Sequence, residues 1–174
     1  MVNYNGRKIV YTFRYGALMT KGDKIGFSIM TAFWLVMMIL SVSLGYLFNS
    51  TVDGWICFTL TGILFIILLA ITLKFWLRDM RAEKEIAKWL TDENLFEATA
   101  VPYECDPKLT KTGYAYKHAI NFENNGNSYQ SVTADYDRLR NFYQAVKSEK
   151  EKEVTFLYSP KYGEVMVFEN KQVK

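Results

Sequence analysis

The chain has 174 residues, which is enough for one modest domain or for a membrane hairpin with one small domain. Half of the residues are hydrophobic (50%), but almost all of the continuous apolar sequence lies between Ile25 and Leu73. The positive net charge lies before the first apolar run, because basic and acidic residues are equal in number from Lys74 onward. The soluble part is therefore neutral, which argues against a nucleic-acid-binding face.

The N-terminal segment 1–24 is basic, with five Lys or Arg residues against the single acid Asp23. It also contains KIVYTFRY at Lys8–Tyr15. This short stretch could add a strand to the soluble domain if both lie on the same side of the membrane.

Two long runs without a charged residue follow, at Ile25–Phe48 and Gly54–Leu73. The first is about 36 Å long as a helix, and a hydrocarbon core about 30 Å thick needs about 20 residues. Helices of this length that are buried on every side by protein are rare in so small a chain. We therefore predict transmembrane helices at 25–48 and 54–73. Neither contains an ionisable residue, which argues against a pore or pump built from this chain alone.

The residues between the two runs contain no Lys or Arg, whereas basic residues flank both outer ends. The positive-inside rule then places the loop 49–53 outside and both termini in the cytoplasm. The sequence thus predicts a two-pass protein of the bacterial plasma membrane, with the lipid bilayer as its first partner.

A juxtamembrane helix is predicted over 74–93, because LRDMRAEKEIAKWLTD has strong helix formers and no Gly or Pro. Ile86, Trp89 and Leu90 form one apolar stripe among its charges. The stripe either packs on the following domain or lies along the membrane surface. Nearby acidic residues weaken any attraction to anionic lipid, which favours packing.

From Leu95 the apolar period changes to two, which predicts a small β-rich domain over 94–174. Tyr114–Phe122 alternates as a half-buried strand does, and the Asn-Gly pair that follows favours a hairpin. The other predicted strands are Leu95–Tyr103, Ser128–Thr133, Val154–Tyr158 and Val165–Phe168. Five short antiparallel strands favour a barrel-like sheet, so the fold class is a membrane α-helical hairpin plus an α+β domain.

One helix is predicted to interrupt the strands, because Tyr136, Leu139 and Val146 share a helical face. Asp135 stands where a helix cap is expected. Asp135 and Asp137 could instead bind a cation on a loop, but capping explains Asp135 without a metal.

The order of these features resembles a known family. The resemblance rests on three motifs: A-T-A-V at Ala98–Val101, G-x-x-Y at Gly126–Tyr129 and V-T-F-L-Y-S-P at Val154–Pro160. They are similar to the widespread uncharacterised bacterial two-helix membrane proteins that have a small cytoplasmic β-barrel domain. The resemblance covers most of Phe96–Asn170 and implies no catalytic residues. The predicted helix near residues 135–147 departs from the family, which more often has a short loop there.

Motifs for chemistry are scarce. His118 is the only histidine and falls on the apolar side of its strand, where a hydrogen-bonded interior residue is commoner than a ligand. Cys57 and Cys105 lie in different parts of the chain and are expected to stay unpaired. We find no zinc, triad or phosphate-loop pattern and expect no catalytic residue, metal or cofactor. The candidate surface for a ligand or partner is His118, Tyr116, Tyr129 and Tyr158.

The functional hypothesis is a non-enzymatic, membrane-anchored interaction or accessory protein that acts through its β domain. Its partner would be another protein or a second copy of the chain, and an immunity protein against a membrane-acting toxin is one concrete form. The alternative is a membrane-anchored sensor whose β domain binds a lipid headgroup or a small ligand.

Overall fold

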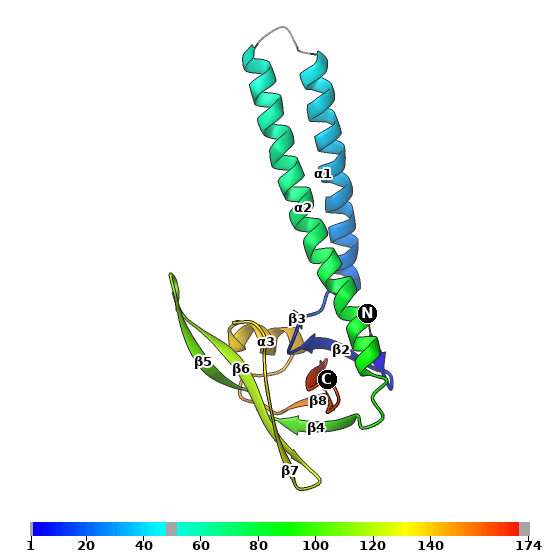
Figure 1. Ribbon diagram of the computed structural model, residues 1–174, viewed down its shortest axis with the longest axis vertical. Coiled ribbons are helices and arrows are strands. Elements are labelled where there is room, and N and C mark those ends of the chain that lie inside the picture. The colour runs from blue at the N-terminus through cyan, green and yellow to red at the C-terminus, as the bar shows by residue number, and fades with distance from the viewer. Residues whose placement is uncertain (1, 48–51, 171–174) are drawn as a thin grey trace. The chain divides into compact units, whose positions relative to one another are not determined.

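The computed structural model describes residues 2–47 and 52–170, which divide into two compact units. The β unit joins the chain up to Met19 to the chain from Arg81 onward, and the helical unit is Thr20–Met80. The helices are α1 (Lys21–Leu47), α2 (Val52–Trp89) and α3 (Leu139–Val146) (Figure 1). The strands in the described residues are β1 (Asn3–Tyr4), β2 (Arg7–Thr12), β3 (Gly16–Ala17), β4 (Phe96–Ala100), β5 (Tyr103–Thr110), β6 (Gly113–Asn124), β7 (Asn127–Val132), β8 (Val154–Ser159) and β9 (Glu164–Phe168).

In the helical unit, α1 and α2 pack along a seam with the spacing of a coiled coil. The less exposed positions of α1 alternate three and four residues apart, at Lys24, Phe27, Thr31, Trp34, Met38, Ser41 and Gly45. The rings of Trp34 and Phe65 lie 5.8 Å apart, and a β-carbon at Gly45 would lie 3.1 Å from Cβ of Phe58. The small residues of α1 therefore serve contact with α2.

The helices begin and end at other residues than predicted. The amide of Thr20 donates to Asp23 (2.8 Å) and the amide of Asp23 donates to the Thr20 hydroxyl (3.2 Å), so a capping box starts α1 before the predicted span. An ion pair between Lys24 and Asp79 (2.9 Å) joins the two helices near this end. Residues 49–51 of the predicted loop and the side chain of Cys57 lie outside the described residues.

The second predicted span and the predicted juxtamembrane helix are one element, because α2 continues unbroken to Trp89. No Gly or Pro lies between Gly62 and Trp89, so no residue in this stretch ends the hydrogen-bond pattern of the helix. The boundary predicted at residue 74 marks a change in polarity and no change in backbone structure.

The larger sheet of the β unit has six antiparallel strands in the order β1-β2-β9-β8-β4, with β3 also paired to β2. The N-terminal segment thus joins the β unit, where Ile9 pairs with Phe168 and Tyr11 with Val167. This answers the question that the pattern at Lys8–Tyr15 left open.

Both faces of this sheet are covered. Along β8, Phe156 belongs to the cluster beneath α3, whereas the adjacent Leu157 belongs to a second cluster on the opposite face. Ile86 and Trp89 fill that second cluster and are fully buried. The apolar stripe of α2 therefore packs on the β unit. This is the alternative that the nearby acidic residues favoured over contact with the membrane surface.

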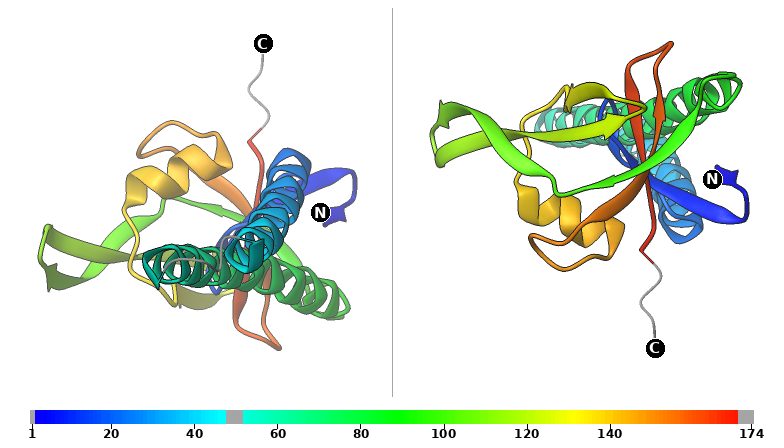
Figure 2. Two further views of the ribbon diagram at one scale, coloured as in Figure 1. Left: turned by 90° about the horizontal axis from the view of Figure 1, so that it is seen from above. Right: turned by 90° about the horizontal axis from the view of Figure 1, so that it is seen from below.

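The smaller sheet has the order β5-β6-β7, and Figure 2 shows its β5–β6 hairpin reaching past the other strands of the β unit. Asn125 and Gly126 have positive φ (52° and 76°) between the paired residues Asn124 and Asn127, which confirms the predicted Asn-Gly hairpin. The described strands number nine in two sheets and close no barrel, so the mixed α and β content is confirmed and the five-stranded barrel is not. The predicted strand Leu95–Tyr103 is in fact β4 and the first residue of β5, separated at Pro102.

The predicted cap of α3 is wrong. The helix begins at Leu139 after Arg138, whose side chain makes no cap, and the Leu139 amide donates to Glu104 Oε1 (3.4 Å) instead. A bridge between Tyr116 and Asp137 holds Asp137 beside β6, so Asp135 lies too early to cap. Asp137 accepts hydrogen bonds from the Arg138 amide and the Asn141 side chain, both at 2.7 Å, which accounts for its carboxylate without a cation.

Candidate functional site

The four residues that the sequence predicted to form a candidate binding surface lie in three different environments of the β unit. His118 is fully buried beside Phe142, with ring centroids 6.0 Å apart. Neither of its ring nitrogens has a hydrogen-bond partner among the described residues. The interior position is confirmed, whereas neither nitrogen makes a well-formed hydrogen bond to a described residue; its polar interaction is with the backbone of Asp137. Burial, which removes water from the imidazolium, lowers the pKa of His118, although Asp137 and Glu104 oppose the shift.

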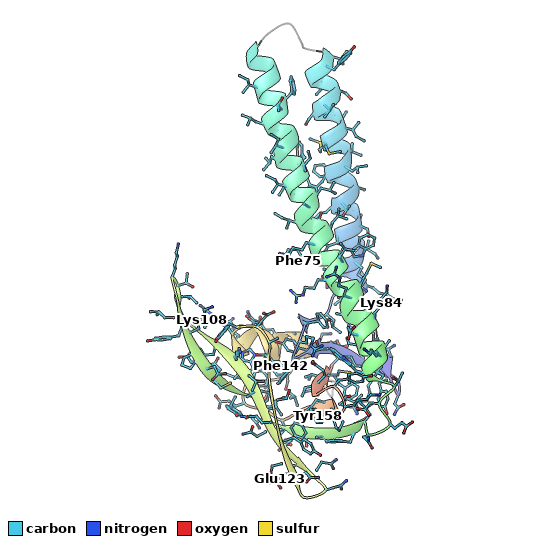
Figure 3. The ribbon with its side chains drawn as sticks, in the orientation of Figure 1. Phe75, Lys84, Lys108, Glu123, Phe142 and Tyr158 are labelled. Atoms are coloured by element: carbon cyan, nitrogen blue, oxygen red, sulfur yellow. The ribbon has the colours of Figure 1, made fainter. Side chains whose placement is uncertain are left out.

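Tyr129 and Tyr158 belong to an aromatic cluster at the other end of β6. Their rings lie 5.3 Å apart, and both contact Phe96 and Phe122. Tyr158 is buried, and desolvation raises the pKa of its phenol. It therefore packs the core and offers no accessible surface. Figure 3 shows Tyr158 and Phe142 within the β unit.

Tyr116 is half-buried, and its ring lies 6.3 Å from that of Tyr114. It shares a face of β6 with His118, but no contact joins it to Tyr129 or Tyr158. The structure thus separates the predicted candidates instead of gathering them into one site.

A different surface lies on the outward side of the smaller sheet. Tyr103 and Val132 flank Ala119 across three neighbouring strands and are 36% and 39% exposed, whereas Ala119 itself is fully buried beneath the surface. The Tyr103 hydroxyl donates to Asn121 Oδ1 (3.2 Å) and accepts from Gln130 Nε2 (2.8 Å). We call Tyr103, Ala119, Asn121, Gln130 and Val132 the outer patch. It is uncharged, and hydrogen bonds hold its aromatic ring in place.

The edge of β5 is protected against pairing with another strand. The register shifts between Cys105 and Lys108, Asp106 has a positive φ of 50°, and Pro107 has no amide hydrogen to donate. Bulges, prolines and charged residues are the devices that prevent sheet extension at an edge. Contacts to this sheet would therefore use side chains rather than an added strand.

The end of the β5–β6 hairpin carries the most exposed apolar side chains of the β unit. Leu109 and Tyr114 face each other across the two strands and are 72% and 62% exposed. Lys108 and Lys117 each place an ammonium group over the Tyr136 ring, at 5.2 and 5.3 Å. We call residues 108–114 the hairpin tip, and Figure 3 labels Lys108 on it.

A depression of about 570 Å³ lies at another place on the β unit, lined in part by Lys8, Lys147, Glu153 and Glu169. Its charges are largely paired, since Glu169 contacts both Lys8 (3.8 Å) and Lys147. Contact with these lysines lowers the pKa of Glu169. The lining also includes Val146, Val154 and Phe168 and is close to neutral, which suits a small polar ligand with an apolar part better than an isolated anion.

Metal and thiol chemistry find little support. Within residues 2–47 and 52–170, no group of three or more His, Cys, Asp or Glu side chains is placed to hold a metal ion. Cys105 is a free, half-buried thiol whose pKa is raised by burial and by Asp106. A raised pKa leaves the thiol protonated and unreactive at neutral pH.

Sequence reasoning missed both the outer patch and the hairpin tip because it missed β5. This strand is exposed along nearly its whole length, so no alternation of apolar and polar residues marks it. The usable signal was the turn Lys111-Thr112-Gly113, whose Gly113 has φ +116° before a clearly alternating strand. No protein-family model, curated protein or solved structure matches this chain.

Proposed function

We propose that this chain is a non-enzymatic, membrane-anchored interaction protein whose β unit binds a protein partner through the outer patch. The observation that carries this proposal is Tyr103, which is exposed and yet fixed by two hydrogen bonds between uncharged neighbours. Exposed tyrosines among Asn, Gln and small apolar residues are typical of protein-binding surfaces. Fixing the ring beforehand lowers the entropy lost on binding.

The membrane anchor is supported by the surface of the helical unit. Both helices are long and apolar enough to span a bilayer, and only 6% and 11% of their apolar windows are buried. A core helix of a soluble protein would be mostly buried. Each Leu or Ile side chain that stays in water loses about 1.5–3 kcal/mol of burial free energy, so an exposed apolar surface of this size favours a lipid environment.

The orientation follows from charge. Basic residues flank the outer ends of both helices and none lies in 48–53, so both termini are proposed to face the cytoplasm. The partner would then be a cytoplasmic or membrane protein, or a second copy of this chain. An immunity protein against a membrane-acting toxin is one form of this function.

Crosslinking before extraction tests the proposal. The full-length chain is treated with a crosslinker in cells, extracted in mild detergent and analysed by mass spectrometry. We expect a discrete complex that the double variant Tyr103→Ala, Val132→Ser loses and that Arg140→Gln, an exposed change on α3, retains. Recovery of only a monomer under all conditions would contradict the proposal.

A sensor for a small polar ligand is the second candidate, and the depression near Glu169 favours it. Thermal shift of the full-length protein against a panel of polar metabolites and soluble headgroups tests it. A stabilising compound that fails to stabilise Glu169→Gln would support this function over the first.

A further inference from the structure

We propose that the hairpin tip docks on the anionic lipid surface of the membrane in which the chain is anchored. This contact is separate from protein binding by the outer patch, and it rests on the membrane anchoring proposed above. The tip combines exposed apolar side chains with lysines at the end of an extended hairpin.

The apolar part of the tip lies beyond the core. His118 is the last fully buried residue of β6 in the direction of the turn, and Tyr114 lies four residues further, or about 13 Å along an extended strand. Leu109 and Tyr114 remain 72% and 62% exposed, and the ring of Tyr114 contacts that of the neighbouring Tyr116. An aliphatic side chain opposite a tyrosine is suited to the membrane interface, where the ring keeps its hydroxyl in water.

The charge of the tip matches an anionic surface. The hairpin from Asp106 to Lys117 has three lysines and one acid. In the part of the chain that the structure describes, no carboxylate forms an ion pair with Lys108 or Lys111. Both lysines are exposed, and long lysine stems let apolar neighbours enter the interface while the ammonium groups stay among the headgroups.

A protein occupant is less well supported at this place. The bulge at Asp106 and Pro107 prevents strand addition along β5, and the tip has no fixed aromatic ring such as Tyr103. A weak lipid contact is sufficient here, because anchoring in the same membrane supplies an effective concentration of about millimolar or more. Each lysine near an anionic surface contributes about a fivefold increase in affinity, so two lysines give about 25-fold.

The test uses the full-length chain in nanodiscs, with an environment-sensitive NBD dye on Thr112→Cys in a Cys57→Ser, Cys105→Ser background. We compare phosphatidylcholine discs with discs that also contain phosphatidylglycerol. We expect a blue-shifted, brighter emission only in the anionic discs, and its loss in 1 M NaCl, where the screening length falls to about 3 Å.

Two variants and one control make the result specific. Lys108→Gln with Lys111→Gln should lower the docking constant about 25-fold, and Leu109→Ser with Tyr114→Ser should abolish the blue shift. Lys150→Gln with Lys152→Gln removes the same charge from another exposed loop and should leave the signal unchanged. Equal emission in neutral and anionic discs would overturn the proposal, whether the tip stays in water or contacts protein.

The assay also separates this proposal from the one on which it rests. Failure of the chain to co-purify with the nanodisc would contradict membrane anchoring, whereas co-purification without a dye response contradicts only the tip contact. With one copy of the chain in each nanodisc, neither another protein partner nor a second copy is present, so the result does not depend on the outer patch.

Discussion

The two sheets of the β unit use the same antiparallel pairing but differ in what covers them. The central strands β8 and β9 of the six-stranded sheet are buried on both faces, and all five residues of β9 are buried. The three-stranded sheet has one face on the core, while its outward face and most of β5 are exposed. The larger sheet therefore maintains the fold, and the smaller sheet is the part available for recognition.

This difference predicts unequal costs of truncation. Trp89 is fully buried against the larger sheet, so Trp89→Ala should lower the free energy of unfolding by about 3–5 kcal/mol. Leu109→Ala on the exposed tip should change it by less than about 0.5 kcal/mol. Denaturant unfolding of the full-length protein in detergent compares them. Similar losses for both variants would contradict the division between the sheets.

His118 tests the face of the smaller sheet that contacts the core. Because its buried nitrogens make no well-formed hydrogen bond to a described residue, His118→Leu should stabilise the protein by about 1 kcal/mol. The pKa of His118 lies below its usual value of 6.5 in the folded state, so the unfolded chain takes up a proton first as the pH falls. The wild-type protein should then lose more stability than the His118→Leu variant as the pH falls below 6.5.

Unfolding curves of the two proteins between pH 7.5 and pH 5.5 make this comparison. Other titrating groups are common to both proteins and cancel in the difference. If the difference in the free energy of unfolding stays constant across this pH range, His118 has the same pKa in the folded and unfolded states, which would contradict the prediction.

An effect on stability as small as that at the hairpin tip is expected at the outer patch. Tyr103→Ala should change the free energy of unfolding by less than about 0.5 kcal/mol, because the side chain is exposed and its hydrogen bonds are replaced by water. The same variant should lose most of the crosslinked complex. A large loss of stability would assign Tyr103 to the fold and not to recognition.

The sequence was informative wherever burial leaves a periodic pattern. The alternation in Tyr114–Phe122 and the Asn-Gly turn predicted β6 and its hairpin, and the stripe at Ile86 and Trp89 predicted the contact of α2 with the β unit. The two long apolar helices were also evident from composition.

The remainder depended on tertiary structure. The exposed strand β5 has no apolar periodicity, so two sheets were read as one barrel. Because Asp137 forms a bridge with Tyr116, α3 begins later in the chain than the sequence pattern predicted. This long-range contact cannot be derived from local helix propensity. Residue type alone also selected His118 and Tyr158 as a surface, although both are buried.

Photo-crosslinking in intact cells tests the recognition role of the smaller sheet most directly. A photoreactive amino acid is placed at Val132 in the outer patch and, as a control, at Arg140 on α3 of the same unit. We predict a discrete protein adduct from position 132 that disappears with Tyr103→Ala, and none from position 140. Equal adducts from both positions, or none from position 132, would contradict the account.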